Sequence, residues 1–181
     1  MLELTTQRCV LRPLTLSDAG ALFDIFSDPD VMRYWDSSPW QTIEEANDYI
    51  QASKPSLDEP EKLVLGIYEQ PGQQLLGKCM LFNIDQYSRR AELGFGIAKA
   101  HWGRGIVNEV GFALIQFAFQ EMQLNRIEAE IDPDNTGSAK VLTRLGFSQE
   151  GYLPERWIVD GRMSDSAIYG LLASQWSQSG R

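Results

Sequence analysis

One stretch of the sequence constrains the fold more than any other. An apolar strand through Phe95 to Ala98, a loop with Gly103 and Gly105, and a long apolar helix over 106–122 follow one another directly. Glycine lets a backbone take positive φ and come close to a ligand. The helix that follows directs its unpaired N–H groups and the positive end of its dipole at the same point. The pattern therefore predicts a pocket for a phosphate or pyrophosphate group.

Two other glycine-rich phosphate motifs do not fit this loop. A dinucleotide fingerprint needs a third glycine where the chain has Asn108, and its usual acidic partner is not evident. A Walker-type loop needs Gly-Lys-Ser/Thr after a four-residue spacer, and the chain has no such run here. The loop therefore predicts phosphate binding of another kind.

The composition is that of an ordinary globular protein. With 181 residues, 43% of them hydrophobic, the chain can bury roughly 70% of its unfolded surface, and we expect a single domain over residues 1–181. The net charge of −9 argues against a nucleic-acid partner and is compatible with a cationic substrate. No apolar stretch is long enough for a membrane span, and the N-terminus lacks the pattern of a signal peptide. Cys9 and Cys79 lack metal-ligand spacing, so we expect buried reduced thiols, no metal, no membrane association and a cytoplasmic location.

Hydrophobic periodicity and turn signals predict alternating strands and helices. Strands are expected at 10–14, 62–69, 74–84, 90–98 and 126–131, with two more joined by an Asp160-Gly161 turn. Helices are expected at 15–26, 42–53, 106–122 and 135–144, the first two opened by capping boxes and the last ended by Gly146. Segment 28–35 is expected to be short helix or irregular. Hairpins followed by βαβ units predict an α/β fold with a mixed sheet and helices on both faces.

The strand before the glycine loop has two unlike faces. One face carries bulky apolar side chains, whereas the other, beyond Glu92, carries only Gly94, Gly96 and Ala98. Glycine in a strand often marks close approach by a ligand or another backbone. The bare face therefore predicts either an extended ligand lying along the strand or a tight packing site for a helix.

Several sequence blocks occur together in the order and at the intervals of a known family. They are Arg8–Leu14, Trp102-Gly103-Arg104-Gly105-Ile106, Asn135, Ser138, Leu145-Gly146-Phe147, Asp160-Gly161, Asp165 and Tyr169. Over nearly its whole length the chain resembles the GCN5-related N-acetyltransferase (GNAT) superfamily. It is most similar to the RimJ/RimL group of ribosomal-protein N-terminal acetyltransferases. The resemblance implies a mixed, mostly antiparallel central sheet of about six to seven strands with helices on both faces.

The resemblance also implies acetyl-CoA as the acetyl donor. The pyrophosphate is then expected on the loop residues Trp102, Gly103, Arg104, Gly105, Ile106 and Val107. The pantetheine arm is expected to pair with open backbone groups of Phe95, Gly96, Ile97 and Ala98, as in strand addition. Asn135 and Ser138 are expected at the pantetheine or thioester end, although both residue types also suit simple helix capping.

The resemblance implies that a neutral amine attacks the thioester directly and that the reaction passes through a tetrahedral oxyanion. Proximity and an oxyanion-stabilising N–H group supply much of the acceleration. We expect Glu92 to act as general base, through water, unless it forms a salt bridge with Arg89 or Arg90. Leu142 stands where many members have a tyrosine acid, so Ser138 is the nearest polar group to protonate the thiolate.

The acceptor is the least constrained part of the prediction. Tyr34 and Trp35 fall where family members form the acceptor wall, and core packing is the alternative for both. The lone His101 is expected to be structural or exposed, and Glu109 is expected to cap or balance the helix dipole. We expect the N-terminal α-amine of a protein, such as a ribosomal protein, as acceptor, with a small amine (polyamine, aminoglycoside or amino acid) as the alternative. A CoA-binding module without turnover is a third reading, and the chain is expected to be a monomer or a homodimer.

Overall fold

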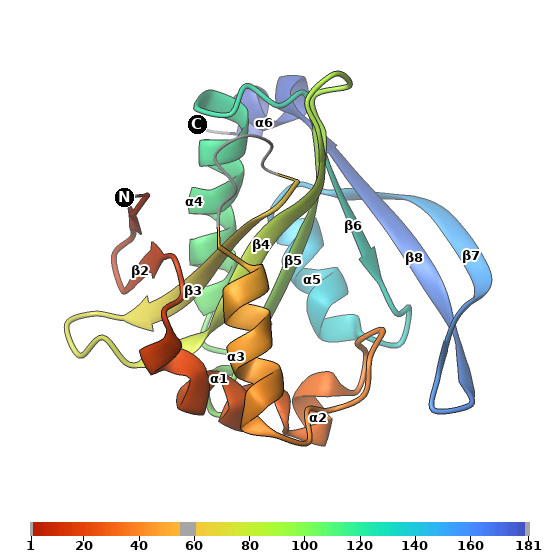
Figure 1. Ribbon diagram of the computed structural model, residues 1–181. Helices are drawn as coiled ribbons and strands as arrows, with labels where there is room; N and C mark the ends of the chain where they lie inside the picture. The colour runs from red at the N-terminus through yellow and green to blue at the C-terminus, as the bar shows by residue number, and fades with distance from the viewer. Residues whose placement is uncertain (1, 55–60, 180–181) are drawn as a thin grey trace.

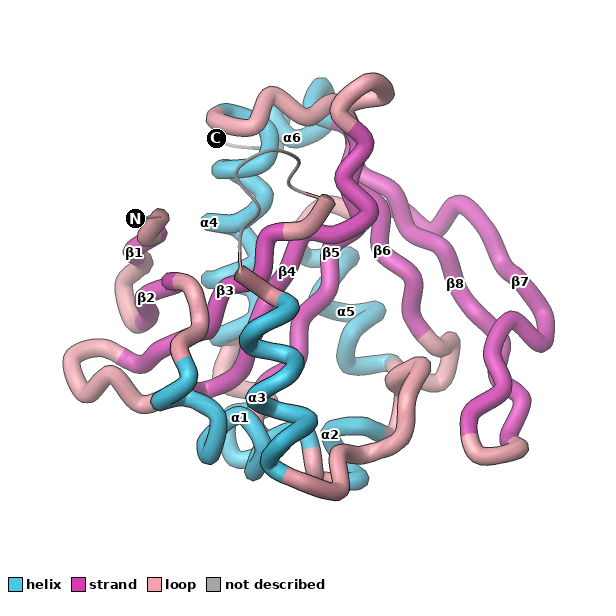
Figure 2. Tube along the Cα trace, viewed as in Figure 1, coloured by secondary structure: helices cyan, strands magenta, loops and turns pink. Residues whose placement is uncertain are grey.

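The fold is built on one mixed sheet, seen here in a computed structural model that describes residues 2–54 and 61–179. The strands are β1 (Leu4–Thr5), β2 (Cys9–Arg12), β3 (Leu63–Glu69), β4 (Leu75–Asp85), β5 (Arg90–Ile97), β6 (Arg126–Ile131), β7 (Ser148–Val159) and β8 (Arg162–Leu172). Within these described ranges they form an eight-stranded sheet in the order β1-β2-β3-β4-β5-β6-β8-β7, with β5–β6 as its one parallel pair. Figure 2 shows the sheet and the β7–β8 hairpin at its far edge.

Helices cover both faces of this sheet, as the sequence predicted (Figure 1). They are α1 (Ala19–Phe26), α2 (Pro29–Met32), α3 (Ile43–Ala52), α4 (Ile106–Gln120), α5 (Thr136–Arg144) and α6 (Ala173–Ser179), with 3-10 turns η1 (Leu16–Asp18) and η2 (Lys99–His101). One core packs α4 and α5 against the sheet, and a second packs α1, α2 and α3 against the other face. The crossover from β5 through α4 to β6 is the central unit, and residues along α4 such as Val110, Leu114 and Ile115 are fully buried.

Local signals account for where most elements begin and end. The carboxylates of Asp18 and Glu45 accept hydrogen bonds from the backbone N–H groups of Thr15 (2.7 Å) and Thr42 (2.9 Å), so the predicted capping boxes are present. Gly146 has φ +92° just after α5, which confirms the predicted helix stop. Asp160 (φ +50°) and Gly161 (φ +78°) form the β7–β8 turn, both with the positive φ that a type I′ turn needs.

The sheet differs from the prediction at its first edge. The strand expected at 10–14 is Cys9–Arg12, because Pro13 has no N–H with which to continue a ladder. The two-residue strand Leu4–Thr5 was not predicted, since so short a segment shows no periodicity. It brings the sheet to eight strands, and α6 is a further element that the sequence did not indicate.

Cys9 and Cys79 are buried free thiols, as expected. In the ranges 2–54 and 61–179, no helix has the length and hydropathy that a membrane span requires. Over the same ranges, no cluster of three or more His, Cys, Asp or Glu side chains is arranged to hold a metal ion.

Candidate active site

The parallel strands β5 and β6 separate after a short paired stretch. They are joined only between Arg90–Glu92 and Arg126–Glu128. Beyond Glu92, β5 continues to Ile97 on β4 alone, and β6 continues to Ile131 on β8 alone. The edges that face each other across this splay have no strand partner, and two clefts open around it. Unpaired backbone edges of this kind are where an extended, amide-containing ligand can add as a strand.

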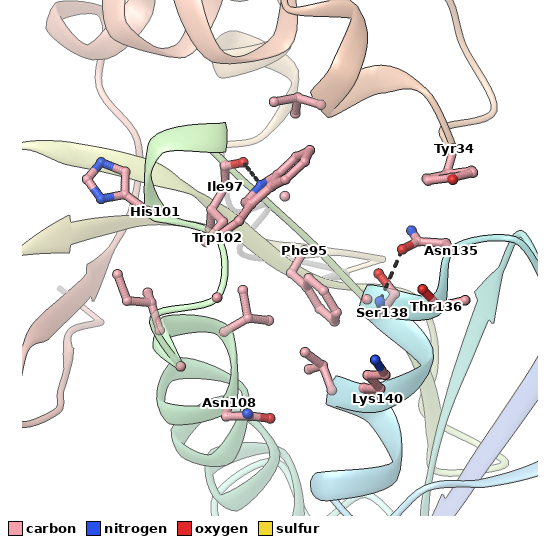
Figure 3. A pocket seen from close by; sticks show the side chains of 18 of the residues that line it. Tyr34, Phe95, Ile97, His101, Trp102, Asn108, Asn135, Thr136, Ser138 and Lys140 are labelled. Atoms are coloured by element: carbon pink, nitrogen blue, oxygen red, sulfur yellow. Dashed lines mark hydrogen bonds between the residues drawn. The ribbon is translucent and has the colours of Figure 1, made fainter.

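The first cleft, here called the loop cleft, has a volume of about 440 Å³ and lies between the glycine loop, β5 and α5 (Figure 3). Predicted residues in its lining are Tyr34, Trp35, Phe95, Gly96, Ile97, Trp102, Gly103, Gly105, Ile106, Val107, Asn135 and Ser138. The sequence therefore located most of this cleft. Their roles toward a ligand stay predictions.

The glycine loop has the backbone geometry that the sequence indicated. Gly103 has φ +72° and Gly105, the N-cap of α4, has φ +75°. The indole Nε1 of Trp102 donates to the carbonyl oxygen of Ile97 at 3.0 Å, which ties the loop to the end of β5. Gly105 precedes the first turn of α4, whose leading N–H groups have no helical acceptor, and the first three residues of this turn line the cleft. An anion placed there meets both these donors and the positive end of the helix dipole.

Polar groups that the sequence did not single out also face the loop cleft. Asn108 Oδ1, on the first turn of α4, is buried and accepts no hydrogen bond within the part of the chain that the structure describes. Lys140 and Arg144 line the cleft from α5. Lys140 lies on the opposite side of the cleft from Asn108 (Figure 3). Their helical spacing of four was visible in the sequence, but which face of α5 meets the loop was not.

Two of the residues predicted to bind the cofactor, Ala98 and Arg104, lie outside the lining of the loop cleft. The N–H of Ala98 donates to the carbonyl oxygen of Leu76 at 2.8 Å, so it is already bonded to β4. The guanidinium of Arg104 contacts His101 Nδ1 at 2.9 Å, and this exposed pair stands beside the loop. A sequence pattern does not set the direction of an exposed loop side chain such as Arg104.

The bare face of β5 is filled by neighbouring side chains. A Cβ atom on Gly94 would lie 2.7 Å from Met80, and one on Gly96 would lie 2.7 Å from Trp35 and 3.0 Å from Phe26. These glycines therefore allow rings and a thioether to approach the strand. The geometry favours the packing alternative for this face, while the splay toward β6 provides the open edge.

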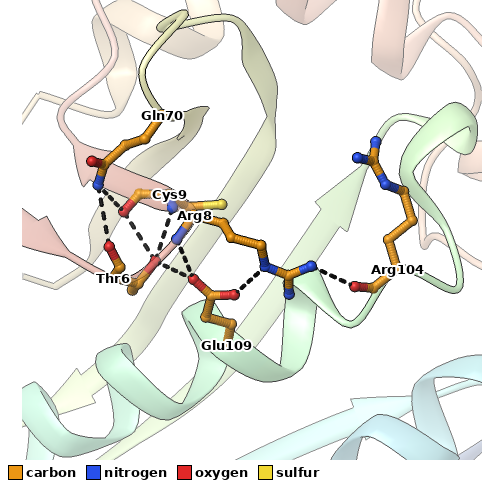
Figure 4. Close-up of polar contacts among 6 residues, drawn as sticks. All are labelled: Thr6, Arg8, Cys9, Gln70, Arg104 and Glu109. Atoms are coloured by element: carbon orange, nitrogen blue, oxygen red, sulfur yellow. Dashed lines mark hydrogen bonds and ion pairs between the residues drawn. The ribbon is translucent and has the colours of Figure 1, made fainter.

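Glu109 anchors the N-terminal segment to the start of α4 (Figure 4). Its Oε1 accepts from Thr6 Oγ1 and from the Arg8 N–H, both at 2.7 Å, and its Oε2 accepts from Arg8 Nε at 2.6 Å. Arg8 also donates to the carbonyl oxygen of Arg104 at 2.8 Å, so the anchor supports the glycine loop from behind. Burial raises the pKa of Glu109, but these hydrogen bonds outweigh it and hold the pKa below its usual value.

Glu109→Gln is expected to destabilise the protein by about 1.5–3 kcal/mol at pH 7, because hydrogen bonds to a charged carboxylate are lost. The depressed pKa in the folded state means that this stabilisation is present above the unfolded pKa, near 4.5, and is lost as the pH falls through the folded pKa. Urea unfolding at several pH values measures the difference in the free energy of unfolding between the wild type and Glu109→Gln. Glu121→Gln, an exposed change at the other end of α4, is the control and is expected to cost less than about 0.5 kcal/mol. Equal effects of the two changes would contradict the anchor.

The second cleft, here called the hairpin cleft, lies between the β5–β6 splay and the β7–β8 hairpin and has a volume of about 540 Å³. Its charged lining residues are Asp36, Glu92, Glu130, Asp132, Asp165, Lys62 and Arg156. Five carboxylates against two cations make this cleft favourable for a positively charged ligand. Among them the sequence indicated Glu92 as a candidate base and Asp165 only as one of the residues of the family resemblance.

Glu92 reaches the hairpin cleft and forms no ion pair with any residue that the structure describes. Its Oε1 accepts from Asn83 Nδ2 at 2.9 Å, whereas Arg90 turns to Asp85 (4.0 Å) and Glu128 (3.3 Å). The salt bridge considered as the alternative role for Glu92 is therefore not formed with Arg90. The carboxylate is left available to a ligand, and its role as a base stays a prediction.

Glu130 is a second carboxylate in the hairpin cleft and is held firmly. Its Oε1 accepts from Trp157 Nε1 at 2.6 Å and from Ser166 Oγ at 2.5 Å, and lies 3.5 Å from Arg156 Nε. No described residue donates a hydrogen bond to its Oε2. In the sequence, Glu130 belongs to the polar face of β6. Only the separation of β5 and β6 in the structure shows that this face opens into a cleft.

The two clefts share one wall. Tyr34, Trp35, Phe95, Asn135 and Ser138 line both of them. The N–H of Ser138 donates to Asn135 Oδ1 at 3.1 Å, so Asn135 does cap α5, whereas the Ser138 hydroxyl has no hydrogen bond among the described residues. Leu142, one turn further along α5, is fully buried and has no proton to give. A group held in one cleft can thus meet a group held in the other beside the Ser138 hydroxyl.

Comparison with known families agrees with this arrangement. The model of the acetyltransferase (GNAT) domain matches residues 8–148, which include the glycine loop, the β5–β6 splay and α5. The chain belongs to the GNAT acetyltransferase family. This confirms the family predicted from the sequence blocks, and the protein is an N-acetyltransferase.

Relatives of this GNAT enzyme match it over nearly its whole length. It is 34% identical to "uncharacterized N-acetyltransferase p20" of Bacillus licheniformis, over 98% of this chain and 99% of the relative. It is 28% identical to the [ribosomal protein uS5]-alanine N-acetyltransferase of Escherichia coli, over 97% and 93% of the two chains. A structure of spermidine N-acetyltransferase from Vibrio cholerae, in complex with CoA and spermine, has a TM-score of 0.82 at 21% identity, covers 93% and 98% of the two chains, and shares the fold.

Proposed function

We propose that this GNAT enzyme binds acetyl-CoA in the loop cleft and a primary amine in the hairpin cleft, and that the amine is the N-terminal α-amine of a protein, such as a ribosomal protein. One observation carries the proposal: the two clefts meet at Asn135 and Ser138. Direct transfer needs both substrates bound at once with their reacting atoms in contact. Two clefts that share a wall satisfy that requirement without a covalent enzyme intermediate.

The loop cleft suits the donor in each of its parts. The pyrophosphate is placed on the N–H groups of the loop from Trp102 to Val107, with Lys140 and Arg144 adding positive charge from α5. The pantetheine arm is placed along the free edge of β5 at Phe95, Gly96 and Ile97. Its amide and hydroxyl groups offer a donor for the orphaned Asn108 Oδ1. The thioester then lies at the shared wall.

The hairpin cleft supplies the groups for amine chemistry. Glu92 accepts the ammonium proton, through water, and leaves a neutral amine to attack the thioester carbonyl. The new C–N bond forms through a tetrahedral oxyanion, and the C–S bond breaks as the oxyanion collapses. The Ser138 hydroxyl donates a proton to the departing thiolate and takes one from the attacking nitrogen, so that the serine ends the step neutral. An α-amine has a pKa near 8, against about 10.4 for lysine, so a protein N-terminus makes the smaller demand on the base.

The choice of a protein N-terminus is supported by the 28% identity to the ribosomal-protein alanine acetyltransferase over nearly the whole chain. With such an acceptor the protein would be a member of the RimJ/RimL group. The carboxylates of the hairpin cleft support a second candidate, a polyamine, because several acidic groups match several ammonium groups. The fold shared with the spermidine enzyme is compatible with that candidate.

Thiol release from acetyl-CoA by the purified protein tests these acceptors against one another. We expect turnover with short peptides that begin with Ser, Ala or Met, and its loss when the same peptides are blocked at the N-terminus. The blocked peptides are the matched controls, and spermidine, aminoglycosides and free amino acids complete the panel. Turnover on spermidine alone moves the assignment to a polyamine. Binding of CoA with no turnover on any acceptor would contradict the proposal and indicate a CoA-binding module.

A further inference from the structure

Lys78 is a buried lysine in the middle of β4. Its exposed fraction is 3%, and it forms no hydrogen bond or ion pair with any residue in the described ranges. The strand register pairs it with Gly66 on β3 and Gly96 on β5, so neither neighbouring strand places a side chain beside it. A buried ammonium without a partner is costly, and its retention calls for a physical reason.

Four aromatic rings surround the ammonium group. Lys78 Nζ lies 3.6 Å from the ring centroid of Tyr49, 4.4 Å from that of Phe26, 5.0 Å from that of Trp35 and 5.8 Å from that of Trp40. The rings also pack on one another, with centroids 5.3–5.6 Å apart for the pairs that include Phe26 or Trp40. This aromatic cage holds the cation through its ring faces in place of water.

The cage is also part of the candidate active site. Trp35 lines both clefts, and Tyr49 lines the hairpin cleft. Lys78 itself lies behind these rings and lines neither cleft. A change in the charge of Lys78 can therefore affect acceptor binding only by changing the positions of Trp35 and Tyr49.

We propose that Lys78 is a positioning residue whose ammonium group holds Trp35 and Tyr49 in place as the wall of the hairpin cleft. The inference rests on the proposed function only where it concerns acceptor binding. When the ammonium loses its proton, the cation–π attraction is lost and the wall loosens. The acceptor then binds more weakly, while acetyl-CoA, held mainly by the loop, binds as before.

The charge state of the cage changes within the physiological range. Burial lowers the pKa of Lys78 to about 7, with a smaller upward influence from Asp36 and a smaller downward one from Lys62. Tyr49 stays neutral, because burial raises its pKa to about 12. His101, the one histidine of the chain, lies in η2 against Arg104 and is not part of the cage. A Lys78 variant leaves His101 unchanged, so comparison with the wild type isolates the effect of the cage.

The first test follows the rings in the ligand-free protein by near-ultraviolet circular dichroism over a pH series. The wild type is expected to show a transition near pH 7. Lys78→Met, which keeps the length of the side chain without its charge, is expected to show none. Lys54→Met, an exposed change outside both clefts, is the control and is expected to behave like the wild type. A transition that persists in Lys78→Met, or is missing from the wild type, would overturn the proposal.

The second test measures KM for whichever acceptor turns over. Lys78→Met is expected to raise the acceptor KM roughly tenfold below pH 7 and to leave the KM for acetyl-CoA within about twofold. Lys78→Arg retains a charge at every pH and is expected to keep a low acceptor KM above pH 7. This variant also tests the proposal if the methionine variant does not fold. Equal pH profiles of acceptor KM in all three proteins would overturn the proposal. Absence of turnover on every acceptor counts against the proposed function alone, since the spectroscopic test of the cage needs no acceptor.

Discussion

Gly105→Val is expected to weaken acetyl-CoA binding by about 100-fold or more, which corresponds to about 2.7 kcal/mol. Gly105 has φ +75° at the N-cap of α4 and lines the loop cleft. A left-handed backbone costs an L-residue roughly 1–2 kcal/mol, and a β-branched side chain costs more. Relaxing that strain turns the leading N–H groups of α4 away from the pyrophosphate. Isothermal titration of acetyl-CoA into the variant measures the effect.

A second glycine provides a matched control for backbone strain. Gly161 has φ +78° in the β7–β8 turn, and a Cβ atom there would meet no atom within 4 Å. Gly161→Val therefore introduces similar strain far from the loop cleft and is expected to leave acetyl-CoA affinity within about twofold. Thermal unfolding of both variants shows whether either has lost its fold. Unchanged affinity in folded Gly105→Val would contradict donor binding at the loop.

Ser138→Ala is expected to lower kcat by roughly 10²-fold, at the low end of the range for general acid catalysis. The hydroxyl stands at the wall shared by the two clefts, has no hydrogen bond among the described residues, and is followed one turn later by a leucine that has no proton to give. Acetyl-CoA affinity is expected to change by less than about threefold, because the Ser138 N–H keeps its bond to Asn135 Oδ1. Steady-state kinetics measure the change in kcat, and titration with acetyl-CoA measures the change in donor affinity.

Thr143→Ala is the control on the same helix. Its hydroxyl donates to the carbonyl oxygen of Ala139 at 2.9 Å, and it lines neither cleft. It is expected to retain full kcat. If Ser138→Ala loses no more activity than Thr143→Ala, the thiolate takes its proton from elsewhere, and the catalytic role of Ser138 is wrong.

The sequence predicted the local parts of this molecule well. Thr15, Thr42, Asn135 and Gly146 mark helix ends through bonds within a few residues, and such bonds can be read from spacing alone. The glycine loop before α4 was found for the same reason. Its positive φ angles and its place ahead of a buried helix are properties of one continuous segment.

The acceptor side could not be predicted, because it is assembled from segments that are distant in the sequence. Glu92, Glu130 and Asp165 come together only where β5 and β6 separate and the β7–β8 hairpin bends over them. Strand separation leaves no mark on the hydrophobic pattern, since both strands stay paired on their other sides. The aromatic cage of Lys78 was missed for a related reason: its four rings all lie within residues 26–49, but the lysine that they surround is on β4 and meets them only in the folded protein.

The bare face of β5 had two explanations in the sequence, a bound ligand or tight packing, and the structure favours packing. Gly94 and Gly96 predicted close approach, and the structure has close approach, by Met80, Phe26 and Trp35 rather than along an empty groove. A glycine signals that a neighbour is near without saying whether it is a ligand or a side chain. The open edge lies in the plane of the sheet, where side-chain alternation gives no signal.

A crystal structure of the protein with CoA would test whether the donor binds between the glycine loop and the β5–β6 splay, because it locates the thiol and the pyrophosphate together. Donor binding in the loop cleft predicts the pantetheine arm between the separated ends of β5 and β6, the sulfur beside the Ser138 hydroxyl, and the pyrophosphate on the loop from Trp102 to Val107. CoA bound away from the β5–β6 splay, or a pyrophosphate that does not touch this loop, would contradict it.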